Sequence, residues 1–359
     1  MTYLKEIDVK TILITGSAGF IGANLVKRLL ITDSPVQIVG LDSVNDYYDV
    51  RIKKYRLESL KQVAVAHPDS SYIFVKGNIA DKALIGRLFA EYSFDVVINL
   101  AAQAGVRYSI SNPDAYIESN LIGFYNILEA CRHSYNNDKE GVQHLVYASS
   151  SSVYGSNKKV PYNTDDKVDN PVSLYAATKK SNELMAHAYS HLYGIPVTGL
   201  RFFTVYGPWG RPDMSPFLFA DAVLHDRPVK VFNQGDMLRD FTYIDDIAEG
   251  VIRCIDRVAE PDPAWNAECP DPACSSAPYR IYNIGNSEPV RLMDFIAAVE
   301  AACEKEAVKE YLPMQPGDVY QTNADTSALQ RDMGYKPSKD IREGIRETVA
   351  WFKSYYHLE

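Results

Sequence analysis

Basic side chains are in the minority in this sequence, and long apolar runs are absent. There are 37 Lys and Arg residues against 46 Asp and Glu, so the formal net charge is -9. This balance argues against a general surface for nucleic acid or anionic membrane, and any phosphate site must be local. No apolar run approaches the ~20 residues of a membrane span, and residues 1–6 lack the charged-then-apolar plan of a signal peptide. We therefore expect a cytoplasmic protein without nucleic-acid or membrane partners.

Cysteine is also scarce. The five cysteines among 359 residues are an odd number and are scattered, which is typical of reduced thiols rather than of a disulfide framework. Cys269 and Cys274 lie close together, but in a Pro-rich loop without nearby histidines, so we expect no metal site. The length suits one large domain with a smaller partner.

A glycine-rich turn near the N-terminus is the first positive feature. Residues 11–15 form a short β-rich apolar run, and Gly16, Gly19 and Gly22 then open a helix with the spacing G-x-x-G-x-x-G. Glycines let the backbone approach a pyrophosphate closely, and a helix N-terminus offers it free N–H groups. A second strand, residues 36–41, ends at Asp42. A carboxylate there can accept both adenosine ribose hydroxyls and would repel a 2′-phosphate, which favours NAD over NADP.

The alternation of strand and helix continues. Residues 72–76, 95–100 and 144–147 read as further strands, and residues 83–92 and 113–131 as helices. Repeated β–α alternation predicts a doubly wound parallel sheet with ligands at the carboxyl ends of the strands. The small residues after the fourth strand would leave room there for a cofactor.

The candidate catalytic residues lie in the central part of the sequence. Residues 148–155 form a strand end rich in serine, and Tyr175 and Lys179 follow four positions apart on a predicted helix. One helical turn separates them, so the ammonium can lower the cost of ionising the phenol. A phenol normally titrates near ~10, too high for a base at neutral pH, and a cation beside it together with a positive nicotinamide ring would favour the phenolate. Tyr-x-x-x-Lys alone is common by chance, and its weight comes from the glycine-rich turn upstream.

Together these motifs resemble the extended short-chain dehydrogenase/reductase superfamily of nucleotide-sugar enzymes, over nearly the whole chain. The resemblance implies an α/β fold with a Rossmann sheet and a smaller mixed α/β C-terminal substrate domain, tightly held NAD, a UDP-sugar substrate and a homodimer. It implies Tyr175 as the base, Lys179 on the nicotinamide ribose with a lowered tyrosine pKa, and Ser150 sharing the proton, with Ser149 and Ser151 as the alternative hydroxyls. The cofactor-binding positions are Gly16, Gly19, Phe20, Ile21, Gly22, Asp42, Asn78, Ile79, Leu100, Ala101, Ala102, Tyr175 and Lys179. Asn78 is a departure, because many relatives carry Asp there.

The absence of carboxylates at two positions narrows the set of reactions that the sequence predicts. Relatives that dehydrate or decarboxylate their sugar place carboxylates between the active hydroxyl and the Val-Tyr-Gly segment. Here those positions are Ser151 and Ser152, which are poor acids at neutral pH. Return of the hydride to the opposite face, which is C4 epimerisation, is the simplest remaining outcome.

The segment 200–214 bears on the substrate. It resembles the corresponding segment of UDP-glucuronate 4-epimerases, which implies Arg211 and Thr204 as partners of the C6 carboxylate, while Arg211 as a phosphate clamp or surface ion pair stays open. The substrate-binding positions expected are Ser150, Ser151, Thr204, Arg211, Phe232 on uracil, Arg239 on the diphosphate and Asp318 on the uridine ribose. Pro316 stands where many relatives have Arg or Glu.

The expected organisation is an NAD-binding domain at 1–200 and a UDP-sugar-binding domain at 201–359, with a strand at 281–285 returning to the first sheet. Helices are expected at 216–225, 247–258 and 341–356, and a loop insertion at 260–279. Three alternatives stay open: a UDP-GlcNAc or UDP-glucose 4-epimerase, a relative of UDP-glucuronate decarboxylase, and a non-catalytic NAD-binding sensor.

Overall fold

A seven-stranded parallel sheet forms the centre of the molecule, with the strand order β11-β6-β5-β4-β1-β2-β3. The computed structural model describes residues 9–135, 141–315 and 319–358. The strands of this sheet are β1 (Lys10–Thr15), β2 (Val36–Asp42), β3 (Ser71–Lys76), β4 (Val96–Asn99), β5 (His144–Ser150), β6 (Val197–Phe202) and β11 (Tyr279–Ile284). The predicted fold class, a doubly wound parallel sheet, is confirmed.

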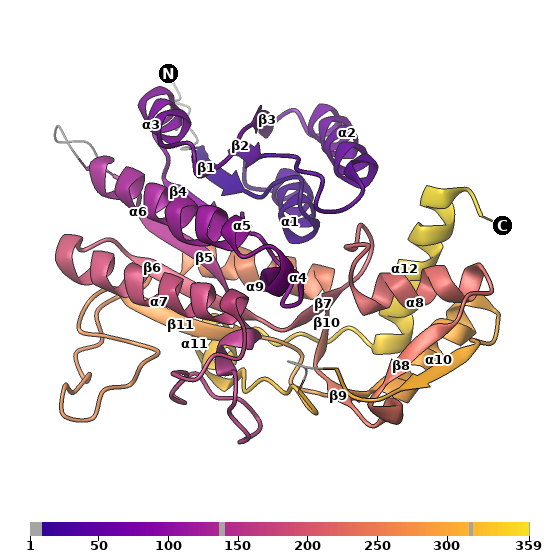
Figure 1. The fold of residues 1–359 in the computed structure, drawn as a ribbon. Helices are drawn as coiled ribbons and strands as arrows, with labels where there is room; N and C mark the ends of the chain where they lie inside the picture. The colour runs from indigo at the N-terminus through magenta and orange to yellow at the C-terminus, as the bar shows by residue number, and fades with distance from the viewer. Residues whose placement is uncertain (1–8, 136–140, 316–318, 359) are drawn as a thin grey trace.

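Both faces of the sheet are covered by helices, which explains why its central strands are apolar along their whole length. On β1, Ile12 and Ile14 pack into one core and Leu13 into another. The first core is shared with helices α1 (Phe20–Leu30) and α9 (Ile244–Asp256). The second is shared with α3 (Lys82–Glu91), α6 (Phe124–His133) and α7 (Leu174–Tyr193). Figure 1 shows α6 and α7 side by side over one face and α9 behind the sheet.

Several helical segments differ from the sequence prediction. The expected helix 113–131 consists of α5 (Asp114–Tyr116), a π-helical stretch η1 (Ile117–Gly123) and α6, preceded by the short α4 (Tyr108–Ser111). Gly123 permits this packing, because a Cβ on it would lie 2.5 Å from Ile79 Cγ1. Three helices were not predicted from the sequence: α2 (Val50–Ala66), α10 (Leu292–Cys303) and α11 (Ser327–Met333).

The C-terminal part adds small two-stranded sheets and further helices. The strand pairs are β7 (Thr204–Tyr206) with β10 (Phe241–Tyr243), β9 (Leu238–Arg239) with β12 (Val290–Arg291), and β8 (Val229–Phe232) with β13 (Lys309–Leu312). The helices are α8 (Ser215–Leu224), α10 (Leu292–Cys303), α11 (Ser327–Met333) and α12 (Ile341–Tyr356), and α8, α10 and α12 gather beside the main sheet (Figure 1). The helices predicted at 216–225, 247–258 and 341–356 are confirmed within a few residues.

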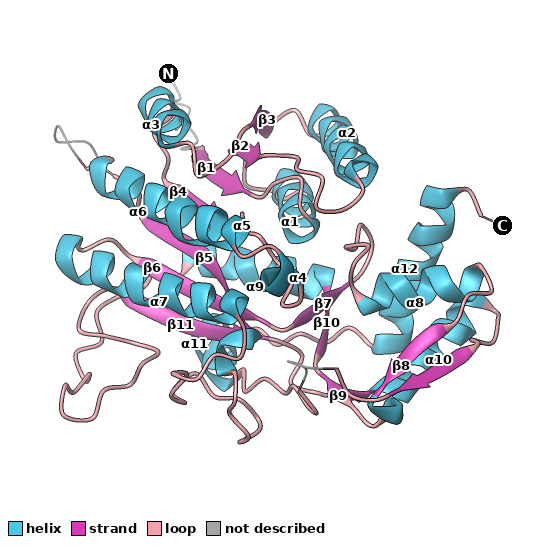
Figure 2. Ribbon diagram, in the orientation of Figure 1, coloured by secondary structure: helices cyan, strands magenta, loops and turns pink. Residues whose placement is uncertain are grey.

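The chain crosses between the two parts more than once. Strand β11 pairs with β6 in the main sheet, so residues 279–284 return to the N-terminal half. The connection from α9 to β11 is drawn as loop in Figure 2. The domain division near residue 200 stays a prediction. Within the described residues, no helix combines the length and apolar character needed to cross a membrane.

Candidate active site

A cavity of about 1510 Å³ opens at the carboxyl ends of the main-sheet strands and extends to the C-terminal part. It brings together nearly every residue that the sequence analysis selected. Its lining includes Gly16, Gly19, Phe20, Ile21, Gly22, Asp42, Asn78, Ile79, Leu100, Ala101, Ala102, Ser150, Ser151, Tyr175, Lys179, Thr204, Arg211, Phe232 and Arg239. Asp318 and Pro316 lie outside the described residues.

The glycines of the N-terminal turn line one end of the cavity with backbone atoms alone. Gly16 has a φ of +73°, and a Cβ on it would lie 2.8 Å from the Ala101 nitrogen. A Cβ on Gly22 would lie 2.1 Å from the Gly16 carbonyl oxygen. Gly19 precedes α1 and has no side chain to cap the first turn, so the N–H groups there face the cavity unscreened. This arrangement fits a dinucleotide pyrophosphate.

Asp42 and Asn78 are fixed by local hydrogen bonds at the same end. Asp42 accepts from the backbone nitrogens of Ala18 at 3.1 Å and Val44 at 2.8 Å. Asn78 accepts from the Ala80 nitrogen at 3.0 Å and donates to Glu118 Oε1, also at 3.0 Å. An aspartate at position 78 would set a second carboxylate against Glu118, which gives a physical reason for the asparagine.

Tyr175 stands at the start of α7, in its first turn. Ser173 caps this helix by accepting from the Ala176 nitrogen at 3.1 Å. Burial raises the pKa of Tyr175, while a hydrogen bond from Ser150 and the charge of Arg211 act in the opposite direction. The positive end of the helix dipole also favours a phenolate there. Ser150 and Tyr175 line the same cavity, and their catalytic pairing stays a prediction.

Lys179 is buried one helical turn after Tyr175. Its ammonium donates to the Ala148 carbonyl at 2.8 Å, and burial lowers its pKa to about 8. Burial is the largest influence on the pKa of Tyr175 and raises it, so the lowering of that pKa by Lys179 stays a prediction.

Ser149 and Ser150 point to different surroundings, as neighbours on a strand do. Ser149 donates to Glu183 Oε1 at 2.7 Å in the core. Glu183 also receives Arg201 Nε at 2.8 Å and Nη2 at 3.0 Å, and this ion pair is completely buried. Ser149 and Ser150 both line the cavity. Because the Ser149 hydroxyl is engaged by Glu183, Ser150 is the hydroxyl that is favoured as the partner of Tyr175.

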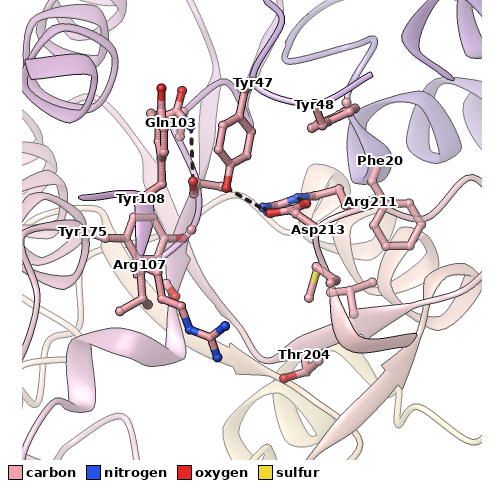
Figure 3. Close-up of a pocket in the computed structure, with 18 of the residues that line it drawn as sticks. Phe20, Tyr47, Tyr48, Gln103, Arg107, Tyr108, Tyr175, Thr204, Arg211 and Asp213 are labelled. Carbon is pink, nitrogen blue, oxygen red and sulfur yellow. Dashed lines mark hydrogen bonds and ion pairs between the residues drawn. The ribbon is translucent and has the colours of Figure 1, made fainter. Parts of the chain in front are cut away.

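Arg211 enters the cavity already paired with a carboxylate. Its Nε and Nη2 bind Asp213 Oδ1 and Oδ2 at 3.0 and 2.5 Å, and the Tyr47 hydroxyl donates to Asp213 Oδ2 at 3.0 Å. Figure 3 shows these three side chains pointing toward one another at the opening, with Thr204 across from Tyr47. Burial opposes the charge on Arg211, but Asp213 outweighs it and raises the arginine pKa.

Tyr47, Asp213 and Arg107 line the cavity, and the sequence analysis missed them. The Arg107 guanidinium carbon lies 5.7 Å from the centre of the Phe232 ring, the ring predicted to stack on uracil. A signal for Arg107 existed, because it follows β4 at the ligand-binding edge of the sheet. Arg239, predicted on the diphosphate, donates to the carbonyls of Leu238 at 2.8 Å and Tyr320 at 3.0 Å.

Comparisons with known proteins agree with this geometry. Residues 12–285 match the model of the NAD dependent epimerase/dehydratase family. Protein CapI of Staphylococcus aureus is 51% identical over 345 residues, covering 96% of this chain and 99% of that protein. A probable UDP-glucuronate 4-epimerase of Rhizobium meliloti is 44% identical over 348 residues, covering 96% and 97%.

Among solved structures, UDP-glucuronic acid 4-epimerase from Bacillus cereus, in complex with UDP-glucuronic acid and NAD, aligns with a TM-score of 0.81 and 30% identity, covering 96% of this chain and all of that one. The match extends across the sheet, the cavity and the C-terminal part. On the family model and on relatives matched over nearly their full length, this chain belongs to the NAD dependent epimerase/dehydratase family.

Proposed function

We propose that this protein is a UDP-glucuronate 4-epimerase, which interconverts UDP-glucuronate and UDP-galacturonate with bound NAD. The relatives named for this activity support the proposal. The observation that carries it is the composition of one cavity: Ser150 and Tyr175 lie beside a turn that has serines at 151 and 152 in place of carboxylates, and Arg211 faces the same space.

Tyr175 and Ser150 handle the proton of the C4 hydroxyl. NAD, held by the glycine-rich turn and Asp42, would supply the hydride acceptor and donor for C4. Tyr175 as phenolate removes the hydroxyl proton, and the hydrogen bond from Ser150 stabilises the charged form. Lys179, fixed by the Ala148 carbonyl, adds positive charge on the same helix face. The same phenol gives the proton back when the configuration has inverted.

Ser151, Ser152 and Asp213 explain why the 4-keto sugar does not undergo elimination. Elimination needs a proton donor near the sugar, and Ser151 and Ser152 are poor acids. Asp213 is no better, because Arg211 overcomes the effect of burial and lowers its pKa, leaving it ionised at neutral pH.

Arg211 and Thr204 hold the C6 carboxylate in this proposal. A 4-keto-uronate is a β-keto acid, which loses CO₂ easily. A carboxylate held charged and close to the sugar plane is protected from that loss. Arg211 can supply this through Nη1, since Asp213 occupies its other donors. Phe232 and Arg239 are proposed for uracil and diphosphate.

A homodimer belongs to the same proposal. The predicted contact uses the helices near 113–131 and 174–193. On α7, Leu184 is 60% exposed and Leu192 is 67% exposed, two positions on one side of the helix. Exposed apolar residues of this kind suit a second copy of the chain.

Proton NMR of the purified protein with UDP-glucuronate and no added cofactor tests the activity. We expect the sugar H4 coupling to change to that of UDP-galacturonate, and a Tyr175→Phe variant to lose nearly all turnover. Formation of UDP-xylose would identify a decarboxylase instead. Turnover of UDP-GlcNAc with no change in UDP-glucuronate would reject the uronate assignment.

A further inference from the structure

Arg56 is a charged side chain with no surface exposure, and the mechanism above does not use it. It lies on α2 and reaches two segments that are far apart in sequence. Its Nη1 donates to the Ala18 carbonyl at 3.0 Å and to the Tyr48 hydroxyl at 2.8 Å. Its Nη2 donates to the carbonyls of Trp209 at 2.5 Å and Gly210 at 3.0 Å.

All of these acceptors are neutral. Among the described residues, no carboxylate lies within ion-pair range of the Arg56 guanidinium. A buried charge without a counter-ion is costly unless its hydrogen bonds are satisfied, so such a residue needs a reason to be where it is. Its Nη1 and Nη2 connect the glycine-rich turn, through Ala18, with the backbone directly before Arg211, while the buried Nε has no hydrogen-bond partner among the described residues.

The backbone held by Arg56 is in an unusual conformation. Trp209 has a φ of +64°, in the left-handed region that a bulky residue rarely adopts. Such a conformation persists only where the surroundings hold it. Here the two consecutive carbonyls of Trp209 and Gly210 meet one guanidinium nitrogen, and the Lys27 ammonium lies 5.2 Å from the Trp209 ring centre. The residue that follows this segment is Arg211.

We propose that Arg56 is a positioning residue for the sugar C6 subsite. It holds the Trp209–Gly210 backbone in the conformation that directs Arg211 into the cavity, and it fixes that segment to the turn carrying Ala18. The inference rests on the proposed function, because it gives Arg211 a uronate carboxylate to bind. Its consequence is that Arg56 contributes to the choice between a uronate and a neutral sugar without touching either.

A lysine cannot replace Arg56 in this role. The guanidinium is planar and presents its donors in a fixed fork, whereas an ammonium is a single compact charge. Arg56→Lys keeps the charge but cannot reach the acceptors on both segments at once. The variant therefore separates the effect of the positive charge at position 56 from the effect of the hydrogen-bond geometry of Arg56.

The test measures ligand affinity by calorimetry on NAD-loaded protein. Every protein carries Tyr175→Phe, so that the ligand is not consumed. Each is titrated with UDP-glucuronate, UDP-glucose and UDP, and the quantity of interest is the ratio of the dissociation constants of UDP-glucose and UDP-glucuronate. The two sugars differ only at C6, so the ratio isolates that subsite.

We expect Arg56→Lys to lower this ratio by about tenfold, as for a charged pair that loses its alignment, while UDP and UDP-glucose bind as before. Arg211→Leu should bring the ratio close to one, and adding Arg56→Lys to it should change the ratio no further. Arg51→Lys is the matched control, because Arg51 lies on the same helix with its side chain 81% exposed. It should leave the ratio unchanged.

If Arg56→Lys leaves the ratio of dissociation constants unchanged, including by weakening the binding of both sugars equally, the proposed role of Arg56 is overturned and that of Arg211 is not. An unchanged ratio in Arg211→Leu would overturn the assignment of Arg211 and, with it, that of Arg56. If Arg56→Lys does not fold, Tyr48→Phe removes a single acceptor of Arg56 and should lower the ratio by about twofold. An unchanged ratio in that variant would count against the proposal.

Discussion

Ser149 and Ser150 are adjacent on β5 and have different partners. The hydroxyl of Ser149 donates to Glu183, while the hydroxyl of Ser150 accepts from the Ser152 nitrogen at 3.1 Å and acts to lower the pKa of Tyr175. Strand geometry makes this separation automatic, since successive side chains leave opposite faces of the sheet. One strand end thus supplies both an anchor for α7, which carries Glu183, and a hydroxyl for chemistry.

Lys179 gives a prediction about pH. Burial lowers its pKa from 10.5 to about 8 in the folded protein. Below pH 8 both folded and unfolded chains carry the ammonium, and the folded state bears the full cost of burying it. Between the two pKa values the unfolded chain binds more protons, so the contribution of Lys179 to the free energy of unfolding rises with pH. The rise should total about 3 kcal/mol, in proportion to the shift.

Urea denaturation of nucleotide-free protein at pH 7 to 10 measures this effect. The wild-type curve should gain stability relative to Lys179→Met as the pH increases. Titrating groups common to both proteins, including the buried tyrosines, cancel in the difference. A difference that stays constant across this range would show that Lys179 has an ordinary pKa.

Much of the site could be predicted from sequence because its residues are tied to local patterns. The glycine spacing, Asp42 at a strand end and the spacing of Tyr175 and Lys179 each follow from one element and its period. The pairing of Arg211 with Asp213 and Tyr47 could not be predicted in the same way. It depends on how the loop after β2 meets the loop after β7, which no local pattern describes.

At the scale of elements, helix α7 links the cavity to the core. It presents Tyr175 and Lys179 to the cavity, and a turn later it presents Glu183 to the core. Glu183 and Arg201 form a completely buried ion pair that joins this helix to β6. Arg201 also donates to the Tyr154 hydroxyl at 3.1 Å, so the turn after β5 is part of the same network.

Glu183→Gln should therefore destabilise the fold strongly. The glutamine keeps the shape but leaves the Arg201 charge uncompensated, and breaking a buried pair in this way costs about 3 kcal/mol or more. Chemical denaturation measures the loss. Glu249→Gln is the matched control, because the Glu249–Arg253 pair is partly exposed, and it should cost less than about 1 kcal/mol. Equal losses in the two variants would contradict this account.

Helix α2 and the π-helical stretch η1 differ from the prediction for separate reasons. Helix α2 buries Lys53 and Arg56, two charged residues, so its buried face does not appear as an apolar stripe. The stretch η1 packs Gly123 closely against Ile79, a tertiary contact that no local pattern describes. Helices with an ordinary apolar face, such as α9 and α12, were predicted within a few residues.

At the scale of the whole molecule, the proposed homodimer can be tested through α7. Leu184→Glu places a charge in the proposed interface, which should convert the dimer to monomers. Light scattering coupled to size-exclusion chromatography gives the mass directly. Val65→Glu is the control, since Val65 is 83% exposed on α2, and it should leave the mass unchanged. A wild-type monomer, or a Leu184→Glu dimer, would reject this interface.

The return of β11 to the main sheet affects how the chain is synthesised. Val197 on β6 pairs with Tyr279, about 80 residues further along. A ribosome adds roughly 5–20 residues per second, so β6 waits about 4 to 16 s for its edge partner. During that interval the nascent chain presents an apolar strand with an open edge, a template for wrong pairing. The risk of aggregation during synthesis is therefore greatest between the emergence of these two strands.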